Sequence, residues 1–160
     1  MEEKKIILNM RILKTGELND VEMRLRNSAI DAAGSAYAPY SGFFVGAAVL
    51  LDDGTIIKGC NQENAVYPLG LCAERVALSC AGASFPDVPV VSIAIAAVKD
   101  GIVQPSISPC GGCRQAMLET EQRYGQPLSV LLCGSDETVL VSSARDLLPL
   151  SFGKDNLING

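Results

Sequence analysis

Residues 64–78 read NAVYPLGLCAERVAL and place Cys72 where an apolar helical pattern begins. Residues 108–115 read SPCGGCRQ and place Cys110 and Cys113 at the start of a second helical pattern. Two helices whose amino ends meet at one edge of a sheet would bring the three sulfur atoms together. The two stretches therefore predict a single site at the point where both helices begin.

The composition of the whole chain favours one domain that acts on a small molecule. A chain of 160 residues is long enough for a single hydrophobic core, so we expect one domain over residues 1–160. The net charge of −5, with no cluster of Lys and Arg, argues against a nucleic-acid partner. The longest apolar runs, such as residues 93–98, are far shorter than the ~20 residues of a membrane span. We therefore expect neither a membrane nor a nucleic acid as a partner.

The amino terminus and the residue types restrict the chemistry further. In residues 1–13, MEEKKIILNMRIL, Asn9 and Arg11 interrupt the apolar run, so the segment lacks the core of a secretory signal. We expect a cytoplasmic protein, in which six cysteines serve metal binding, catalysis or core packing rather than a disulfide framework. The chain contains no histidine, so any proton carrier must be Glu, Asp, Lys, Tyr or Cys.

Hydrophobic periodicity predicts alternating helices and strands. Apolar residues three and four apart predict a first helix from Asp20, which would cap it, to about Ala36. Two β-rich stretches, 44–51 and 55–61, flank a DDG turn and predict a hairpin. The other expected elements are a helix over 72–83, a strand over 91–98, a helix from the SPC sequence to 124, strands over 129–133 and 138–142, and a helical turn over 144–148. This order predicts an α/β fold with a central sheet of about five strands covered by helices. Residues 1–19 form an amino-terminal extension of unknown role.

The cysteine spacing leaves three interpretations open. Cys110 and Cys113 are separated as two thiolates on one helical turn that hold the same zinc ion, with Zn–S bonds of about 2.3 Å. The same spacing fits a redox dithiol or a pair of buried thiols. Cys72 favours zinc, because three protein ligands leave the fourth position of a catalytic site to water. The remaining cysteines are expected in the core: Cys60, Cys80 and Cys133.

Glu74 makes a vacant fourth position chemically useful. Placed two residues after Cys72, its carboxylate could take a proton from water and pass it to a substrate nitrogen. It could also be a first-turn acid that the helix dipole favours. A Cys-x-Glu sequence followed by P-C-x-x-C is the signature of zinc deaminases, which supports the first interpretation. Three thiolates and Zn²⁺ sum to −1, so we expect the neighbouring Arg75 to lie behind the ligands and offset this charge.

The chain resembles the small cytidine deaminases in four ordered blocks. They are YAPYSGFFVGAAVL (37–50), GCNQENAVYPLGLCAERVAL (59–78), SPCGGCRQ (108–115) and LLPLSF (147–152), and the resemblance covers about residues 20–152. It implies hydrolysis of cytidine and deoxycytidine to uridine and deoxyuridine in pyrimidine salvage. It also implies a three-layer α/β/α sandwich with a mixed sheet, one Zn²⁺ per subunit, and a homotetramer whose neighbouring subunits complete each site.

The resemblance also implies roles for individual residues. Cys72, Cys110 and Cys113 would hold zinc, and Glu74 would be the catalytic proton carrier. The nucleoside contacts would be Asn61 and Glu63 to the ribose, Phe43 beside the pyrimidine, the Ala73 backbone to the base, Tyr67 near the subunit contacts, and Phe152 from a neighbouring subunit. An amide and a carboxylate can together donate to and accept from a sugar hydroxyl, which agrees with the ribose roles.

Three other functions make different predictions. A deaminase of the same fold that acts on a modified nucleoside, as blasticidin-type resistance enzymes do, would prefer the antibiotic over cytidine. A non-catalytic structural zinc module would have a fourth protein ligand and no activity. A thiol redox protein would form a reversible disulfide between Cys110 and Cys113.

Overall fold

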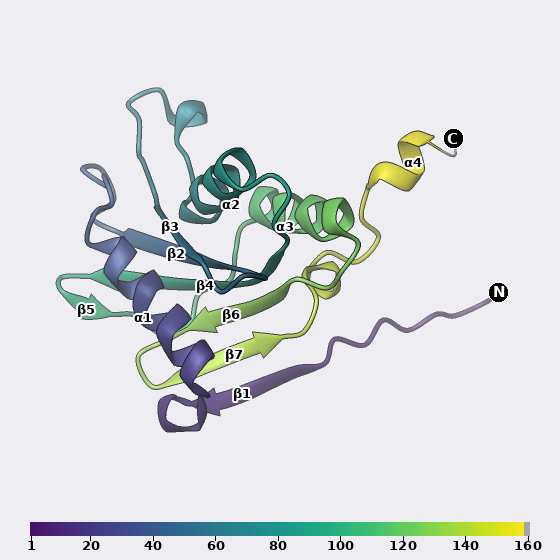
Figure 1. Ribbon diagram of the computed structural model, residues 1–160, viewed down its shortest axis with the longest axis horizontal. Helices are drawn as coiled ribbons and strands as arrows, with labels where there is room; N and C mark the ends of the chain where they lie inside the picture. Colours follow the sequence, from purple (N-terminus) through teal and green to yellow (C-terminus); the bar gives the residue numbers. More distant parts are fainter. Residues whose placement is uncertain (159–160) are drawn as a thin grey trace.

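Seven strands form one mixed sheet in the computed structural model, which describes residues 1–158 (Figure 1). The strands are β1 (Met10–Lys14), β2 (Phe44–Leu51), β3 (Ile56–Cys60), β4 (Val90–Lys99), β5 (Ile102–Val103), β6 (Ser129–Cys133) and β7 (Glu137–Val141). The α-helices are α1 (Asp20–Ala33), α2 (Ala73–Ser84), α3 (Gly111–Tyr124) and α4 (Lys154–Ile158). Short 3-10 helices are η1 (Thr15–Glu17), η2 (Tyr67–Leu69) and η3 (Ala144–Leu147). The strand order is β1-β7-β6-β4-β2-β3, with β5 paired to β4, and only β4 and β6 are parallel neighbours.

Helices cover both faces of the sheet, as the α/β/α prediction required (Figure 1). On one face α1 packs through Leu25 and Ala29 against alternate strand residues such as Ala94. On the other face α2 and α3 pack against the opposite set, with Ala77 and Met117 in the same buried cluster as the strands. Successive strand side chains point to opposite faces, so each central strand contributes to both cores. No helix within residues 1–158 is long and apolar enough to span a membrane.

All five expected strands are present, and the sheet has two more than the sequence indicated. β1 pairs antiparallel with β7, from Met10 opposite Val141 to Lys14 opposite Glu137. The exposed side chains of Met10 and Ile12 gave this segment a weak pattern, because a strand with little burial carries no strict apolar alternation. β5 has only two residues and pairs with the end of β4.

The first helix differs from its prediction at both ends. Its N-cap is Asn19 and not Asp20: Asn19 Oδ1 accepts the Glu22 N–H at 2.9 Å, and the Glu22 carboxylate accepts the Asn19 N–H at 3.0 Å. This reciprocal pair is a capping box. The helix ends at Ala33 rather than near Ala36, because the chain then turns toward β3, where the Tyr37 N–H donates to the Asn61 carbonyl at 3.0 Å.

Close packing of α2 on the sheet fixes the part of the fold that carries the site. Gly59 in β3 lies directly beneath the helix: a Cβ atom at this position would be 2.4 Å from the Ala77 nitrogen and 2.7 Å from the Ala73 oxygen. Only glycine fits at that distance. The first turn of α2 therefore packs directly on the backbone of β3. The absence of a side chain at Gly59 allows this short distance between helix and sheet.

Candidate active site

The three cysteines of the two motifs lie together where α2 and α3 begin. Cys72 is the N-cap of α2, Cys110 is the N-cap of α3, and Cys113 follows in the first turn of α3. The Sγ atoms of Cys72 and Cys110 are 3.9 Å apart, and those of Cys110 and Cys113 are 3.4 Å apart. All three sulfur atoms are within 4.8 Å of one another. The structure thus brings the predicted metal ligands into one cluster.

The sulfur cluster has the dimensions of a zinc site. Tetrahedral coordination with Zn–S bonds of about 2.3 Å places ligand sulfurs about 3.8 Å apart. The two observed separations, 3.4 and 3.9 Å, fall on either side of that value. Within residues 1–158 the donor group consists of these three cysteines alone. Three protein ligands are typical of a catalytic zinc site, which keeps one position for water, whereas a structural site uses four.

Without a metal ion the three thiols have different proton affinities. Burial, and then the negative charge of Glu74, raise the pKa of Cys113. Burial also raises the pKa of Cys72. Burial acts in the same direction on Cys110, but hydrogen bonds from Cys113 and from the Gly112 backbone outweigh it and lower the pKa of Cys110. A cation is therefore needed to hold all three sulfurs as thiolates at once.

Arg75 lies in the first turn of α2, next to Glu74 in the sequence. Its Nη2 donates to the Gly70 carbonyl at 3.0 Å, and its buried Nε has no hydrogen-bond partner in the described part of the chain. The Cys72 side chain raises the pKa of this guanidinium. Arg114 has another role, since it donates to the carbonyls of Pro109 and Leu147 at 2.9 and 3.2 Å. Of these two arginines, Arg75 is therefore the one that interacts with Cys72.

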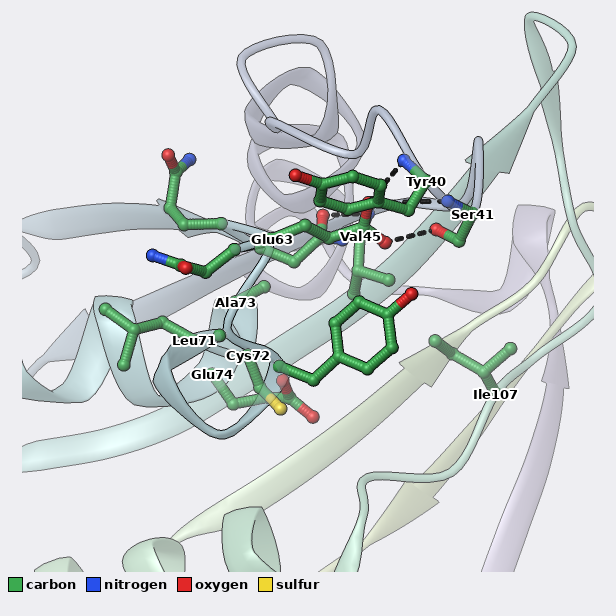
Figure 2. A pocket seen from close by; sticks show the side chains of 14 residues that line it. Tyr40, Ser41, Val45, Glu63, Leu71, Cys72, Ala73, Glu74 and Ile107 are labelled. Atoms are coloured by element: carbon green, nitrogen blue, oxygen red, sulfur yellow. Dashed lines mark hydrogen bonds between the residues drawn. The ribbon is translucent and has the colours of Figure 1, made fainter.

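A cavity of about 610 Å³ opens beside the cluster. Cys72, Ala73 and Glu74 line it on the side of the sulfur atoms, and the Glu74 side chain is only 5% exposed. Figure 2 shows the Glu74 carboxylate next to Cys72, and Glu63 lies away from them, beside Tyr40. The volume is in the range of small-molecule sites. One side of the cavity is therefore lined by Cys72 of the cluster and the Glu74 carboxylate, and another side is lined by the Glu63 carboxylate.

The Glu63 carboxylate binds the loop that contains Tyr40 and Ser41, which also lines the cavity. Its carboxylate accepts the Tyr40 N–H at 2.8 Å and the Ser41 hydroxyl (Figure 2). The Ser41 hydroxyl, and then the Tyr40 N–H, lower the pKa of Glu63, so the group stays ionised below its ordinary range. The neighbouring Asn61 accepts the Val45 N–H at 2.8 Å and donates to the Phe43 carbonyl at 3.0 Å. Both proposed ribose-binding side chains are therefore held in place by backbone contacts.

Two of the predicted nucleoside contacts, Phe43 and Phe152, are not among the residues that line the cavity of the single chain. Asn61, Glu63, Tyr67 and Ala73 line the cavity, but Phe43 is not among its lining residues and contributes its carbonyl to Asn61. Phe152 also lies outside the cavity, with its side chain 59% exposed and its carbonyl accepting from Gln115. Sequence reasoning missed the other eight lining residues: Tyr40, Ser41, Val45, Gln62, Asn64, Gly70, Leu71 and Ile107.

The YAPYSG stretch carries the main missed contribution. In the sequence this stretch was used only as part of the block 37–50 that resembles the small cytidine deaminases, yet Tyr40 and Ser41 donate hydrogen bonds to Glu63. The Tyr40 and Tyr67 rings meet edge to face with centroids 6.1 Å apart at the mouth of the cavity. The pairing of two segments 23 residues apart has no local signal in the sequence.

Comparison with known proteins agrees with this geometry. Residues 20–124 match the family model of the cytidine and deoxycytidylate deaminase zinc-binding region. The chain belongs to this family. It is 41% identical over 133 residues to a cytidine deaminase of Mycobacterium tuberculosis, an alignment that covers 83% of this chain and 90% of the relative. A cytidine deaminase of Halalkalibacterium halodurans is also 41% identical, with 83% and 95% of the two chains covered.

A solved structure supports the same assignment. The crystal structure of cytidine deaminase from Burkholderia pseudomallei superposes with a TM-score of 0.67 at 43% identity, covering 81% of this chain and 97% of that one. The region matched by the deaminase family model contains Cys72, Glu74, Cys110 and Cys113, and excludes Phe152. The zinc-binding description of the family and the three-thiol donor set both identify Zn²⁺ as the metal.

Proposed function

We propose that this chain hydrolyses cytidine and deoxycytidine to uridine and deoxyuridine with release of ammonia, as a step of pyrimidine salvage. The observation that carries the proposal is the position of the Glu74 carboxylate, beside a three-sulfur cluster at the wall of a nucleoside-sized cavity. The relatives that are 41% identical to it are named cytidine deaminase, which supports the same reaction.

The positions of Glu63 and Glu74 in the cavity predict how the nucleoside is oriented. Asn61 and Glu63 would bind the sugar hydroxyls, because their fixed oxygens accept and the amide donates. The base would then point toward Cys72 and Glu74. Ala73 is the first residue of α2, so its N–H has no partner within the helix and could donate to the pyrimidine carbonyl.

The chemistry follows from this placement. When bound, zinc supplies a Lewis acid that makes a water molecule nucleophilic toward C4 of the ring. Glu74 would accept a proton from the attacking water and deliver it to N3 of the pyrimidine, and would then transfer the remaining proton of the new C4 hydroxyl to the departing amine. Arg75 would offset the negative charge of the thiolates from behind Cys72. Breaking of the C4–N bond releases ammonia and leaves a uracil ring on the sugar.

The assembly belongs to the same proposal. We infer a homotetramer in which Phe152 reaches a neighbouring subunit's site and Tyr67 lies at a subunit contact. The exposure of these side chains, 59% for Phe152 and 76% for Tyr67, supports this role, because large aromatic side chains at a cavity mouth and on a carboxyl-terminal segment are typical contact residues. A cytoplasmic location agrees with a cluster that needs free thiols.

The test is a spectrophotometric assay of nucleoside deamination with and without a zinc chelator. Cytidine and deoxycytidine should both be converted, the chelator should abolish turnover, and added Zn²⁺ should restore it. Blasticidin should be a poor substrate in the same assay. Preference for the antibiotic, or binding of zinc without turnover of any of the three compounds, would refute the proposal.

A further inference from the structure

We propose that Arg26, on the face of the sheet opposite the cavity, is a positioning residue for the cavity wall that contains Ile107. The inference rests on the proposed function, since it assigns that wall to nucleoside binding. Arg26 belongs to α1, and Ile107 lies in the irregular segment between β5 and α3. A turn between β6 and β7 connects the two.

Arg26 is a buried cation with a backbone partner. Its side chain is 8% exposed, and its Nη2 donates to the Gly134 carbonyl at 2.9 Å. Its Nε is buried without a hydrogen-bond partner, and within residues 1–158 no carboxylate lies within ion-pair distance of it. A buried charge without an opposite charge is costly. Stability alone would favour an apolar side chain at this position. We therefore infer that the hydrogen bond to Gly134 has a function other than stability.

The β6–β7 turn, which accepts the hydrogen bond from Arg26, is in direct contact with the segment that forms the cavity wall. The Ser135 N–H donates to the Gln104 carbonyl at 3.1 Å, which fixes the start of the segment. Gly134 then packs against the backbone of the next residues, since a Cβ atom at 134 would be 2.6 Å from the Ser106 nitrogen and 3.2 Å from the Pro105 carbonyl carbon. A turn displaced by a few tenths of an ångström would displace this wall too.

Ile107 packs against the hydrophobic core, but few hydrogen bonds fix the backbone of this wall. Within the described residues the backbone of 105–108 makes no hydrogen bond, and the next anchor is the Pro109 carbonyl, which accepts from Arg114 at 2.9 Å. Ile107 sits in the middle of this unbonded stretch and lines the cavity. The zinc ligand Cys110 comes after the second anchor. Loss of the Arg26 contact should therefore move Ile107 while leaving the metal cluster in place.

The test compares Arg26→Met with Arg26→Lys and with Arg24→Met, an exposed position of the same helix. Methionine fills the buried volume without a charge, so the thermal midpoint should be unchanged or higher. KM for cytidine and the dissociation constant of uridine, measured by calorimetry, should both rise about tenfold, with kcat within about threefold of wild type and zinc content unchanged. Lysine can still donate to Gly134 and should restore most of the affinity, and Arg24→Met should behave as wild type.

A crystal structure of the methionine variant provides a readout that does not depend on turnover. Residues 105–107 should be displaced relative to wild type, with the three zinc-ligand sulfurs unmoved. Wild-type affinity for uridine in Arg26→Met, a loss of affinity that lysine does not restore, or an unmoved wall would overturn the inference. Failure of wild-type protein to deaminate cytidine would instead refute the proposed function, and the position of the wall would still decide the role of Arg26.

Discussion

Cys72 and Cys110 are both N-cap residues, of two different helices, and their sulfur atoms are 3.9 Å apart. The amino ends of α2 and α3 therefore meet at the cluster, with unpaired backbone N–H groups and the positive ends of both helix dipoles directed toward it. This convergence favours anionic sulfur at the site. It also explains how a chain without histidine can build a metal site next to the Glu74 carboxylate.

Removal of one cluster sulfur should remove the metal. In Cys110→Ala the remaining pair, Cys72 and Cys113, leaves two of four positions without a protein ligand, and bound zinc should fall to well below one ion per chain in elemental analysis. Cys80→Ala is the matched control, because Cys80 is an exposed thiol of α2 outside the cluster. The prediction that Cys80 is buried in the core was wrong, since it lies on the solvent-facing side of the helix. Full zinc occupancy in Cys110→Ala would contradict the ligand assignment.

Replacement of Glu74, the proposed proton carrier, should separate metal binding from turnover. Glu74→Gln keeps the size of the side chain but cannot carry a proton, so kcat for cytidine should fall about 1000-fold or more while zinc content stays at the wild-type level. Glu119→Gln, at an exposed position of α3, should leave both unchanged. A Glu74→Gln enzyme with substantial activity would show that another group carries the proton.

Patterns within single segments predicted most of the fold. The apolar alternation of β2 and β4 and the helical period of α2 gave the sheet and its covering, because these segments bury a definite face. β1 was not predictable in the same way: two of its apolar side chains stay exposed, and its position depends on the distant edge of β7. Edge strands are specified by their partner more than by their own pattern.

Within the site, too, residues with a local sequence pattern were predictable and residues with distant contacts were not. Cys72, Glu74, Cys110 and Cys113 were predictable because their chemistry is unusual and their spacing is local. Tyr40 and Ser41 were not, since their contact with Glu63 links segments more than 20 residues apart through backbone N–H groups that any sequence provides. Phe43 was assigned from the resemblance alone, and in the single chain the residue that faces the cavity from β2 is Val45.

The hydrogen bonds of Glu63 should give stability that depends on pH. Its pKa in the folded protein is lowered from 4.5, so folding favours the ionised form. The contribution is complete above pH 4.5 and is lost as the pH falls through the lower pKa of the folded state. Glu63→Gln should therefore melt below wild type at pH 7, and the difference should narrow as the pH falls below 4.5. A difference in melting temperature that stays constant from pH 7 to pH 3 would contradict this.

The amino-terminal extension should contribute through β1 alone. Deletion of residues 2–14 removes the pairing with β7 and the contact of Leu13 with the core beneath α1, and should lower the free energy of unfolding by about 3 kcal/mol in urea denaturation. Deletion of residues 2–9, which are exposed and lie outside the sheet, should change it by less than about 0.5 kcal/mol. Equal effects of the two deletions would show that β1 adds no stability.

The contact between Gly59 and α2 should couple packing to activity. Gly59→Ala would place a methyl group 2.4 Å from the Ala77 nitrogen, and because the neighbouring atoms are backbone, the helix must move away from β3. We expect a loss of about 2 kcal/mol in the free energy of unfolding. Cys72 and Glu74 begin this helix, so zinc affinity and kcat should fall as well. Gly16→Ala, where a Cβ atom meets nothing within 4 Å, is the control for the general effect of replacing glycine. If Gly59→Ala lowered stability and left kcat and zinc affinity at the wild-type values, the packing of α2 on β3 would not set the geometry of the site.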